Sequence, residues 1–331
     1  MSEPKIKFAL IGCGYIGSRY INILSHHPQC ELGALVDSDC KILSNYKNLT
    51  IPFFHSIENY FNSGLQSDAV VVATPNSTHA SIAIASLEQN KHVLVEKPMA
   101  LRRSDAELVI QTAKQRNKKA MVVLQNRFSP ASIWLKEMVK SKQLGKIFFT
   151  EINCFWNRDE RYYQKGSWHG KRETDGGSLF TQFSHFIDTI FWLFGEVKNI
   201  RSRFNNFNHQ DTVEFEDTGS IQFELEQGGI GCLNFTTAIW DKSFESSLLI
   251  IGQNGTVKVS GQQMNRIDYC HVKNYHLPEK MLKLTDTGDN HANMIDYFIE
   301  SIRRDGLTNT DEALQSVDII ERMYAGADQE R

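Results

Sequence analysis

Residues 5–17, KIKFALIGCGYIG, determine the predicted fold of the first part of the chain. The apolar run Lys5–Ile11 has the composition of a buried strand, and three glycines follow it in the order G-x-G-x-x-G. The residues after them, Ser18–His26, have the periodicity of a helix. In this context the glycines allow a tight turn, a close approach of the backbone to a pyrophosphate, and packing of helix on strand. The segment therefore predicts a dinucleotide site at a helix N-terminus. The residues expected to form it are Gly12, Gly14, Tyr15, Ile16 and Gly17.

An acidic residue follows the second predicted strand, Glu31–Val36. This residue, Asp37, lies about 20 residues after Gly17, where a carboxylate can accept hydrogen bonds from both ribose hydroxyls. A carboxylate there would repel a 2′-phosphate, and neither Ser38 nor Asp39 supplies an arginine, so the sequence favours NAD over NADP. In the alternative interpretation the glycines only form a turn and Asp37 only caps a helix.

The first 125 residues alternate apolar strand patterns with helical patterns. This order predicts an α/β Rossmann domain, a doubly wound parallel sheet, over residues 1–125. The predicted strands are Lys5–Ile11, Glu31–Val36, Ala69–Ala73, His92–Val95 and Ala120–Leu124. The predicted helices are Ser18–His26, Ile57–Ser63, His79–Gln89 and Ser104–Asn117, the last with a serine cap.

The pattern changes after residue 125, where longer strand runs are separated by turn signals. Residues 126–331 are therefore predicted to form an α+β domain with a mostly antiparallel open sheet, which binds the substrate and forms oligomers. The predicted strands are Lys146–Phe155, Val197–Phe204, Gly219–Leu225, Gly229–Thr236, Phe244–Ile251 and Gly255–Ser260. The predicted helices are Pro130–Lys140, Ser178–Phe194 and a tail from His291 onward, which is expected to pack back on the first domain.

Composition argues against several functional classes. The 331 residues suit about two domains. The net charge is −3 and no basic block is present, which argues against a nucleic-acid partner. The longest apolar runs are too short for a membrane span, and the N-terminal residues lack a signal-peptide pattern, so a cytoplasmic location is expected. The six cysteines have no metal-type spacing, which predicts free thiols and no metal site.

Polar residues follow three of the predicted parallel strands, at the sheet edge where ligands of such sheets bind. The cofactor candidates in these segments are Thr74, Pro75, Asn76, His79, Glu96, Lys97 and Gln125. Lys97 comes directly after Val93–Val95, so its ammonium is expected to reach a substrate hydroxyl and assist proton removal as hydride leaves. The alternative is an exposed loop lysine paired with Glu96.

Several of these segments together resemble the Gfo/Idh/MocA oxidoreductase family, which includes glucose–fructose oxidoreductase and inositol dehydrogenase. The matching pieces, in the family's order, are IGCGYIG, VVVATPNSTH, VLVEKPMA, DGGSLFTQFSHFID and WLFG. The resemblance spans essentially the whole chain. It implies that Lys97 is the catalytic lysine and that His185 faces the substrate as proton donor or acceptor. It also implies a homodimer or homotetramer that pairs through the open sheet.

The residues around His185 agree with that resemblance in part. His185 and Asp188 lie three apart in an otherwise apolar helical pattern, and histidine can transfer a proton near neutral pH. A histidine in such a helix can also be a hydrogen-bonded core residue. Many relatives carry Asp or Asn four residues before this histidine, where this chain has Thr181, with Gln182 beside it. Both are candidate substrate contacts, although Thr181 cannot act as a base.

A stretch rich in arginine and aromatic residues, residues 156–170, suggests the substrate class. Such side chains bind phosphate and stack on rings. The pattern resembles the branch of the family that oxidises the 3-hydroxyl of a UDP-linked N-acetylglucosamine or its uronic acid, for glycan synthesis. The candidate substrate contacts are Arg127, Arg158, Arg161, Tyr163 and Trp168. Either Arg158 or Arg161 could bind a carboxylate or diphosphate. Alternatively, these aromatic residues stabilise an oligomer or cover the sheet.

Three further interpretations compete with this one. The first is a dehydrogenase for a free sugar, inositol or dihydrodiol within the same family. The second is a non-catalytic NAD-binding regulatory protein, because a fold alone does not establish chemistry. The third is a cysteine enzyme that uses Cys13 or Cys154, and it is disfavoured because the cofactor would cover Cys13.

Overall fold

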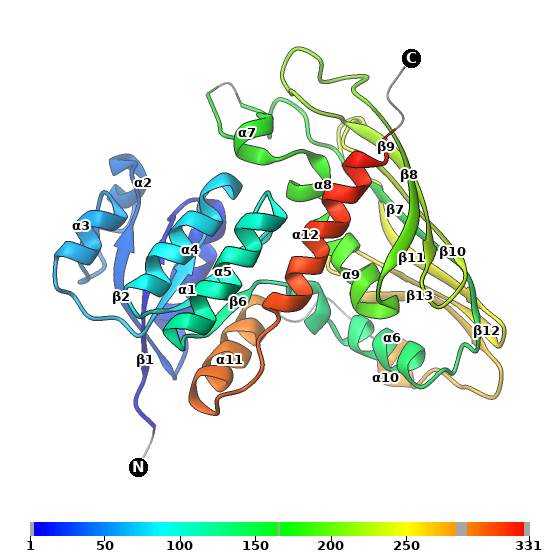
Figure 1. Ribbon diagram of the computed structural model, residues 1–331, viewed down its shortest axis with the longest axis horizontal. Coiled ribbons are helices and arrows are strands. Elements are labelled where there is room, and N and C mark those ends of the chain that lie inside the picture. The colour runs from blue at the N-terminus through cyan, green and yellow to red at the C-terminus, as the bar shows by residue number, and fades with distance from the viewer. Residues whose placement is uncertain (1–2, 165, 283–289, 328–331) are drawn as a thin grey trace. The chain divides into compact units, whose positions relative to one another are not determined.

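The computed structural model describes residues 3–164, 166–282 and 290–327. The chain forms two compact units (Figure 1). The first unit comprises Met1–Val123 with His291–Leu314, and the second comprises Leu124–Asn290 with Gln315–Arg331. The chain therefore passes between the units three times, whereas the sequence analysis placed one boundary after residue 125.

The first unit contains a six-stranded sheet in the order β3-β2-β1-β4-β5-β6, with every neighbouring pair parallel. The strands are β1 Ile6–Ile11, β2 Cys30–Val36, β3 Phe53–Phe54, β4 Ala69–Val72, β5 His92–Val95 and β6 Ala120–Val122. All four residues of β4 are buried, as expected for a strand covered on both faces. The predicted doubly wound fold is confirmed, and its strand order reverses between β1 and β4, where such folds bind dinucleotides.

Helices cover this sheet, and Figure 1 shows two of them, α4 and α5, side by side. The helices of this unit are α1 Tyr15–His26, α2 Cys40–Ser44, α3 Ile57–Asn62, α4 His79–Glu88, α5 Arg103–Arg116 and most of α11 Asn290–Arg303, with a 3-10 turn η1 Asn76–Thr78. The N-cap residue of α5 is Arg102, which makes no side-chain cap, so the predicted serine cap at Ser104 is wrong.

The returning segment after α11 covers the outer strand β6. Asn309 accepts a hydrogen bond from the Val122 N–H at 2.8 Å and donates to the Val122 carbonyl oxygen at 2.7 Å. The side-chain amide thereby pairs with the backbone of the outermost strand, which otherwise would present unpaired groups. Residues 291–314 are thus an integral part of the first unit.

The second unit contains a seven-stranded sheet in the order β13-β12-β11-β7-β10-β9-β8. The strands are β7 Ile147–Phe155, β8 Val197–Asn205, β9 Thr218–Leu225, β10 Ile230–Thr236, β11 Glu245–Gly252, β12 Gly255–Ser260 and β13 Arg266–Val272. Only the β7–β10 pair is parallel, so the predicted mostly antiparallel sheet is confirmed. Ile152, Leu233 and Leu248 lie opposite one another in adjacent strands and form a buried row on one face.

The helices of this unit are η2 Gln125–Phe128, α6 Pro130–Lys140, α7 Arg172–Asp175, α8 Ser178–Thr181, α9 Ser184–Phe194, α10 Glu279–Leu282 and most of α12 Thr310–Ala325. The predicted helix Ser178–Phe194 is therefore two helices, α8 and α9, separated at Gln182 and Phe183. The Gln182 side chain at this break is hydrogen-bonded outside the helix. Within the described part of the chain, no helix is long and apolar enough to cross a bilayer.

Candidate active site

The loop between β1 and α1 requires glycine at two positions and leaves open space at a third. Gly12 has a φ of +89°, and a Cβ there would lie 2.3 Å from the carbonyl oxygen of Ala73. A Cβ on Gly17 would lie 2.1 Å from the carbonyl oxygen of Gly12. A Cβ on Gly14 would meet nothing within 4 Å, so the space beyond it is open. This open space lies at the start of α1, where backbone N–H groups have no partner within the helix, and it fits the pyrophosphate of NAD.

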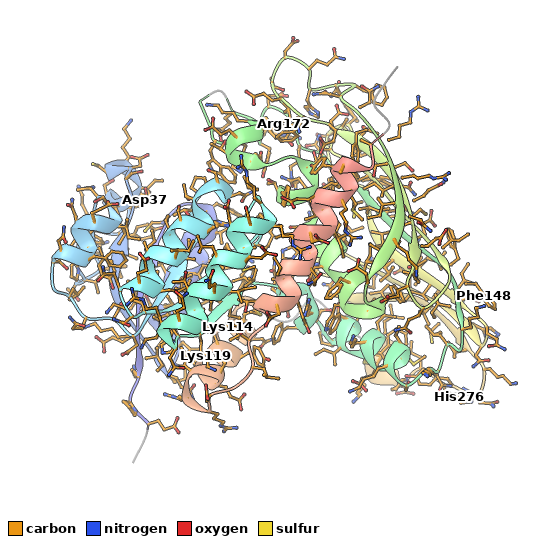
Figure 2. All side chains as sticks on the ribbon, in the orientation of Figure 1. Asp37, Lys114, Lys119, Phe148, Arg172 and His276 are labelled. Atoms are coloured by element: carbon orange, nitrogen blue, oxygen red, sulfur yellow. The ribbon has the colours of Figure 1, made fainter. Side chains whose placement is uncertain are left out.

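Asp37, labelled in Figure 2, directly follows β2. Its carboxylate is oriented by two backbone N–H groups. Its Oδ2 accepts from the N–H of Cys13 at 2.7 Å, and its Oδ1 accepts from the N–H of Asp39 at 2.9 Å. The N-cap of α2 is Asp39, so the interpretation that Asp37 only caps a helix is wrong. Because a carboxylate has about four acceptor positions, Asp37 can still bind ribose hydroxyls.

The thiol of Cys13 lies inside the first unit and donates to the carbonyl oxygen of Val36 at 3.7 Å. Burial, followed by the charge of Asp37, raises the pKa of Cys13 to about 12. Burial also raises the pKa of Cys154 well above its ordinary value. Both thiols are protonated at neutral pH, which removes the basis for the cysteine-enzyme interpretation.

The segment after β4 is an ordered turn at the carboxyl edge of the sheet. The Thr78 hydroxyl donates to the Thr74 hydroxyl at 2.7 Å and to the Pro75 carbonyl oxygen at 2.8 Å. Asn76 begins η1 and is 5% exposed. Thr74, Pro75 and Asn76 therefore lie at the sheet edge where ligands of parallel sheets bind, and their contact with the cofactor stays a prediction.

His79, the first residue of α4, connects the segments that follow β4 and β5. Its Nε2 lies 2.8 Å from the Thr74 carbonyl oxygen, and its Nδ1 lies 2.7 Å from the Pro98 carbonyl oxygen. Burial is the largest influence on this ring and lowers the pKa of His79, and the hydrogen bonds to the Pro98 and Thr74 carbonyl oxygens oppose that shift. The sequence analysis expected a direct cofactor contact, whereas the structure commits both ring nitrogens to the backbone of the two segments.

The carboxylate of Glu96 turns into the first unit. Its Oε1 accepts from the Tyr20 hydroxyl at 2.7 Å and lies 3.8 Å from Nε2 of His291. Its Oε2 accepts from the backbone N–H of Lys97 at 3.2 Å. Lys97 itself is half-buried at the end of β5. This half-buried position does not fit the interpretation of an exposed loop lysine.

In the second unit, Gln125 contacts the candidate catalytic histidine. Its side-chain nitrogen lies 3.0 Å from Nε2 of His185, which is the second residue of α9 and 9% exposed. The Gln125 Oε1 is buried without a hydrogen-bond partner among the described residues. The sequence analysis assigned Gln125 to the cofactor, whereas its described contact is with His185.

Arg127 and Asp188 connect the same two elements through a buried ion pair. The Arg127 guanidinium donates from Nε to Oδ2 of Asp188 at 2.8 Å and from NH2 to Oδ1 at 2.6 Å. The Ser316 hydroxyl donates to the same Oδ1 at 2.9 Å. Arg127 was expected to contact the substrate, whereas this guanidinium is 8% exposed and holds η2 against α9. The pair therefore supports the position of His185.

Arg158 is a half-buried cation in an aromatic setting. Its guanidinium lies 4.8 Å from the ring centre of Trp156 and 5.1 Å from that of Tyr162. Nε donates to the Gln182 side chain at 2.8 Å, and NH1 donates to the Asn157 carbonyl oxygen at 2.8 Å. No carboxylate of the described chain forms an ion pair with it, and burial lowers the pKa of Arg158. A positive charge without a carboxylate partner is suited to an anionic ligand.

The other arginine of this segment, Arg161, differs in this respect. Its side chain is 63% exposed, and it makes an ion pair with Asp159 at 2.5 Å. It also lies 4.0 Å from a carboxylate oxygen of Asp241. Two carboxylates therefore already compensate the charge of Arg161, in contrast to that of Arg158.

Two other predicted substrate contacts are engaged within the second unit. Tyr163 is 5% exposed and packs in a core cluster with Val213 and Phe215. The Thr181 hydroxyl donates to the buried carboxylate of Asp175 and to its carbonyl oxygen, the latter at 2.9 Å. These contacts are within the protein, and a substrate contact of either residue stays a prediction.

One residue that the sequence analysis did not single out lies beside these aromatic residues. The ring of His169 stacks on that of Trp168, with 3.9 Å between the ring centres. It meets the ring of Tyr162 edge-on, with 4.4 Å between the ring centres. Burial, followed by the charge of Arg158, lowers the pKa of His169 to about 4. The sequence contains a signal for this residue, because His169 directly follows Trp168, the tryptophan predicted to bind a ring.

The two halves of the chain match two family descriptions. Residues 6–124 match the oxidoreductase family with an NAD-binding Rossmann fold, and residues 133–258 match the GFO/IDH/MocA C-terminal domain. The chain belongs to the Gfo/Idh/MocA oxidoreductase family. It is therefore an NAD-dependent oxidoreductase, and the glycine loop and Asp37 carboxylate fit that cofactor.

Known proteins resemble the chain along most of its length. The WlbA dehydrogenase of Bordetella pertussis, solved with NADH and UDP-GlcNAcA, is 30% identical, with 97% of this chain and 96% of that chain covered and a TM-score of 0.87. The WlbA dehydrogenase of Chromobacterium violaceum, solved with the same two ligands, is 29% identical, with 98% and 94% covered and a TM-score of 0.90. Oxidoreductase P35 of Formosa agariphila is 27% identical over 311 residues, 86% of this chain and 90% of that protein.

Proposed function

We propose that the protein is an NAD-dependent dehydrogenase that oxidises the 3-hydroxyl of a UDP-linked N-acetylhexosamine or its uronic acid, in glycan precursor synthesis. The observation that carries the proposal is Arg158, a half-buried guanidinium without a described carboxylate partner. A diphosphate or uronate supplies the missing negative charge. The two WlbA relatives, whose structures contain UDP-GlcNAcA, support this substrate class.

Lys97 and His185 are the proposed catalytic residues. When bound, NAD supplies the acceptor for the hydride that leaves the sugar carbon. The Lys97 ammonium donates a hydrogen bond to the hydroxyl oxygen and lowers the pKa of that hydroxyl, and His185 or a neutral Lys97 takes its proton. The product is a ketone. The Gln125 amide holds the His185 ring, and the Arg127–Asp188 pair holds the helix of His185, α9, against η2.

The substrate contacts proposed here are fewer than the sequence suggested. Arg158 binds the anionic group, Gln182 holds Arg158 and Tyr162 in place, and Trp168 offers a ring face. Arg127, Arg161, Tyr163 and Thr181 have structural contacts instead.

The open face of the second sheet supports a homodimer or homotetramer. Ile251, Phe149 and Ile230 lie opposite one another in adjacent strands, and Ile230 is 58% exposed. A row of apolar side chains across a sheet is a favourable surface for a second copy. We place the enzyme in the cytoplasm, where its nucleotide-sugar substrate and NAD are available.

The test is a substrate panel with NAD, in which absorbance of the reduced nicotinamide is followed. The panel contains UDP-N-acetylglucosaminuronic acid, UDP-N-acetylglucosamine, myo-inositol and glucose, with parallel wells containing 2-oxoglutarate in case the cofactor is reoxidised in place. Turnover of a UDP-sugar is expected, and Arg158→Met should raise its KM at least about tenfold. Arg161→Met is the matched control and should change KM little.

Two results would contradict the proposal. Turnover of only inositol or glucose would support a free-polyol dehydrogenase of the same family. Measurable NAD binding without turnover of any compound would support a regulatory protein.

A further inference from the structure

Two buried side chains bond to the backbone on either side of Lys97. We propose that Glu96 and His79 are positioning residues, which fix the main chain of Lys97 so that its ammonium reaches the reacting hydroxyl. This inference rests on the proposed catalytic role of Lys97. Neither side chain is expected to touch the substrate, because Glu96 is 6% and His79 is 1% exposed.

Glu96 fixes the side of Lys97 that is nearer the N-terminus. One carboxylate oxygen accepts the Lys97 N–H at 3.2 Å. The other oxygen is held by the Tyr20 hydroxyl at 2.7 Å, and Tyr20 is a completely buried residue of α1. The carboxylate thus connects Lys97 to the helix whose N-terminus forms the cofactor loop. A buried carboxylate with donors on both oxygens has little freedom to rotate.

His79 fixes the other side of Lys97. Its Nδ1 lies 2.7 Å from the carbonyl oxygen of Pro98, the residue after Lys97. Its Nε2 lies 2.8 Å from the carbonyl oxygen of Thr74, which follows β4. β4 and β5 are neighbours in the sheet, so the imidazole spans the gap that opens where the two strands end.

Together these contacts restrict the backbone on both sides of Lys97. Proton transfer depends on hydrogen-bond distance between donor and acceptor, and misplacement by about 1 Å can cost about a hundredfold in rate. A displaced Lys97 backbone would move the ammonium by a similar amount. The loss is therefore expected in kcat rather than in cofactor binding.

A double-mutant cycle separates positioning from a general structural role. Glu96→Gln and His79→Gln are made alone and in combination with Lys97→Ala, and hydride transfer to NAD from UDP-N-acetylglucosaminuronic acid is followed in single turnovers. Each single variant should lower the rate about ten- to a hundredfold, with NAD affinity within about threefold of wild type. In the Lys97→Ala background each substitution should lower the rate of hydride transfer by less than about a further twofold, because there is no lysine left to position.

His92→Gln is the matched control. His92 lies at the opposite end of β5, where its Nδ1 accepts the backbone N–H of Lys119 at 3.0 Å. It tests the same His-to-Gln substitution at the start of the strand that leads to Lys97. A loss of thermal stability in this variant without a loss of rate would show the effect of a purely structural change. If Lys97→Ala is too slow to follow, the comparison of rate, NAD affinity and melting temperature among the other variants decides.

The outcomes distinguish the inference from the function on which it rests. Normal rates in both Glu96→Gln and His79→Gln, with a large loss in Lys97→Ala, would overturn the inference alone. A loss that persists undiminished in the Lys97→Ala background, or that matches a loss of NAD affinity or of melting temperature, would also overturn it. Near-normal turnover of Lys97→Ala would overturn the proposed function.

Discussion

The side-chain amide of Gln125 lies 3.0 Å from Nε2 of His185, so an uncharged group that can donate or accept is the neighbour of the proposed proton carrier. Rotation of the amide by 180° would exchange its nitrogen and its oxygen. Gln125 can therefore donate to a neutral imidazole or accept from a protonated one. A carboxylate in its place would favour only the protonated form.

That contact predicts the effect of Gln125→Glu on the pH profile. The added carboxylate stabilises the imidazolium of His185, so the neutral base appears only at higher pH. The acid limb of the pH dependence of kcat/KM should move upward by about one pH unit. Gln125→Met, which adds no charge, is the control and should leave the limb in place while lowering the rate. An unchanged limb in Gln125→Glu would mean that His185 does not carry the proton.

Replacement of Asp37 tests the ribose contact. Asp37→Asn removes the charge but keeps an oxygen for the Cys13 N–H, which Asp37 binds at 2.7 Å. The KM for NAD should rise about tenfold, the KM for NADP should fall, and kcat should change little, because this contact is equal in ground and transition states. Steady-state kinetics with both cofactors measures the change. An unaltered NAD to NADP preference would contradict the role of Asp37.

The Arg127–Asp188 pair predicts a large loss of stability when one partner is removed. Arg127→Met leaves the carboxylate of Asp188, which is 2% exposed, without its main counter-charge. The free energy of unfolding should fall by about 3–5 kcal/mol. Arg161→Met, at an arginine that is 63% exposed, is the matched control and should have little effect. Urea unfolding measures both, and similar midpoints for the two variants would refute the assignment of Arg127 as a buried structural cation.

One buried histidine, His79, and two half-buried histidines, His92 and His169, predict acid sensitivity. Burial lowers the pKa of His79, and it lowers those of His92 and His169 to about 4, from an ordinary value of 6.5. Between these pH values the unfolded chain binds more protons than the folded chain does. The free energy of unfolding therefore falls as the pH falls from about 6.5 toward 4. Glu216 acts in the opposite direction, because burial raises its pKa.

The urea midpoint should therefore be lower at about pH 5 than at about pH 7. His92→Gln should show a smaller difference between the two pH values than the wild-type protein does. Equal midpoints at both pH values in the wild-type protein would contradict the lowered pKa values of these three histidines.

The cofactor half of the site could be predicted from sequence because its determinants are local. Gly12, Gly14 and Gly17 lie within six residues of one another, and the apolar runs around Val70 and Val93 identify strands covered on both faces. The exact helix cap could not be predicted, since Asp37 and Asp39 are both acidic and only the fold shows which one caps α2. Local pattern thus locates the loop but does not assign every side chain in it.

The substrate half was less predictable because its contacts are distant in sequence. Arg127 pairs with a carboxylate 61 residues away, which no local pattern reveals. Arg158 and Arg161 look equivalent in sequence, and only the fold shows that Asp241 lies beside Arg161. β13 was missed because its sequence, RIDYCHV, mixes charged and apolar residues without regular alternation.

The most direct test of the central claim is NAD reduction with UDP-N-acetylglucosaminuronic acid by the wild-type protein and by Lys97→Met. Methionine has a similar length to lysine but no ammonium, so it cannot assist proton removal. The proposed mechanism predicts turnover by the wild-type protein and a loss in kcat of at least about a hundredfold in Lys97→Met, with NAD affinity retained. Turnover of Lys97→Met at close to the wild-type rate would contradict it.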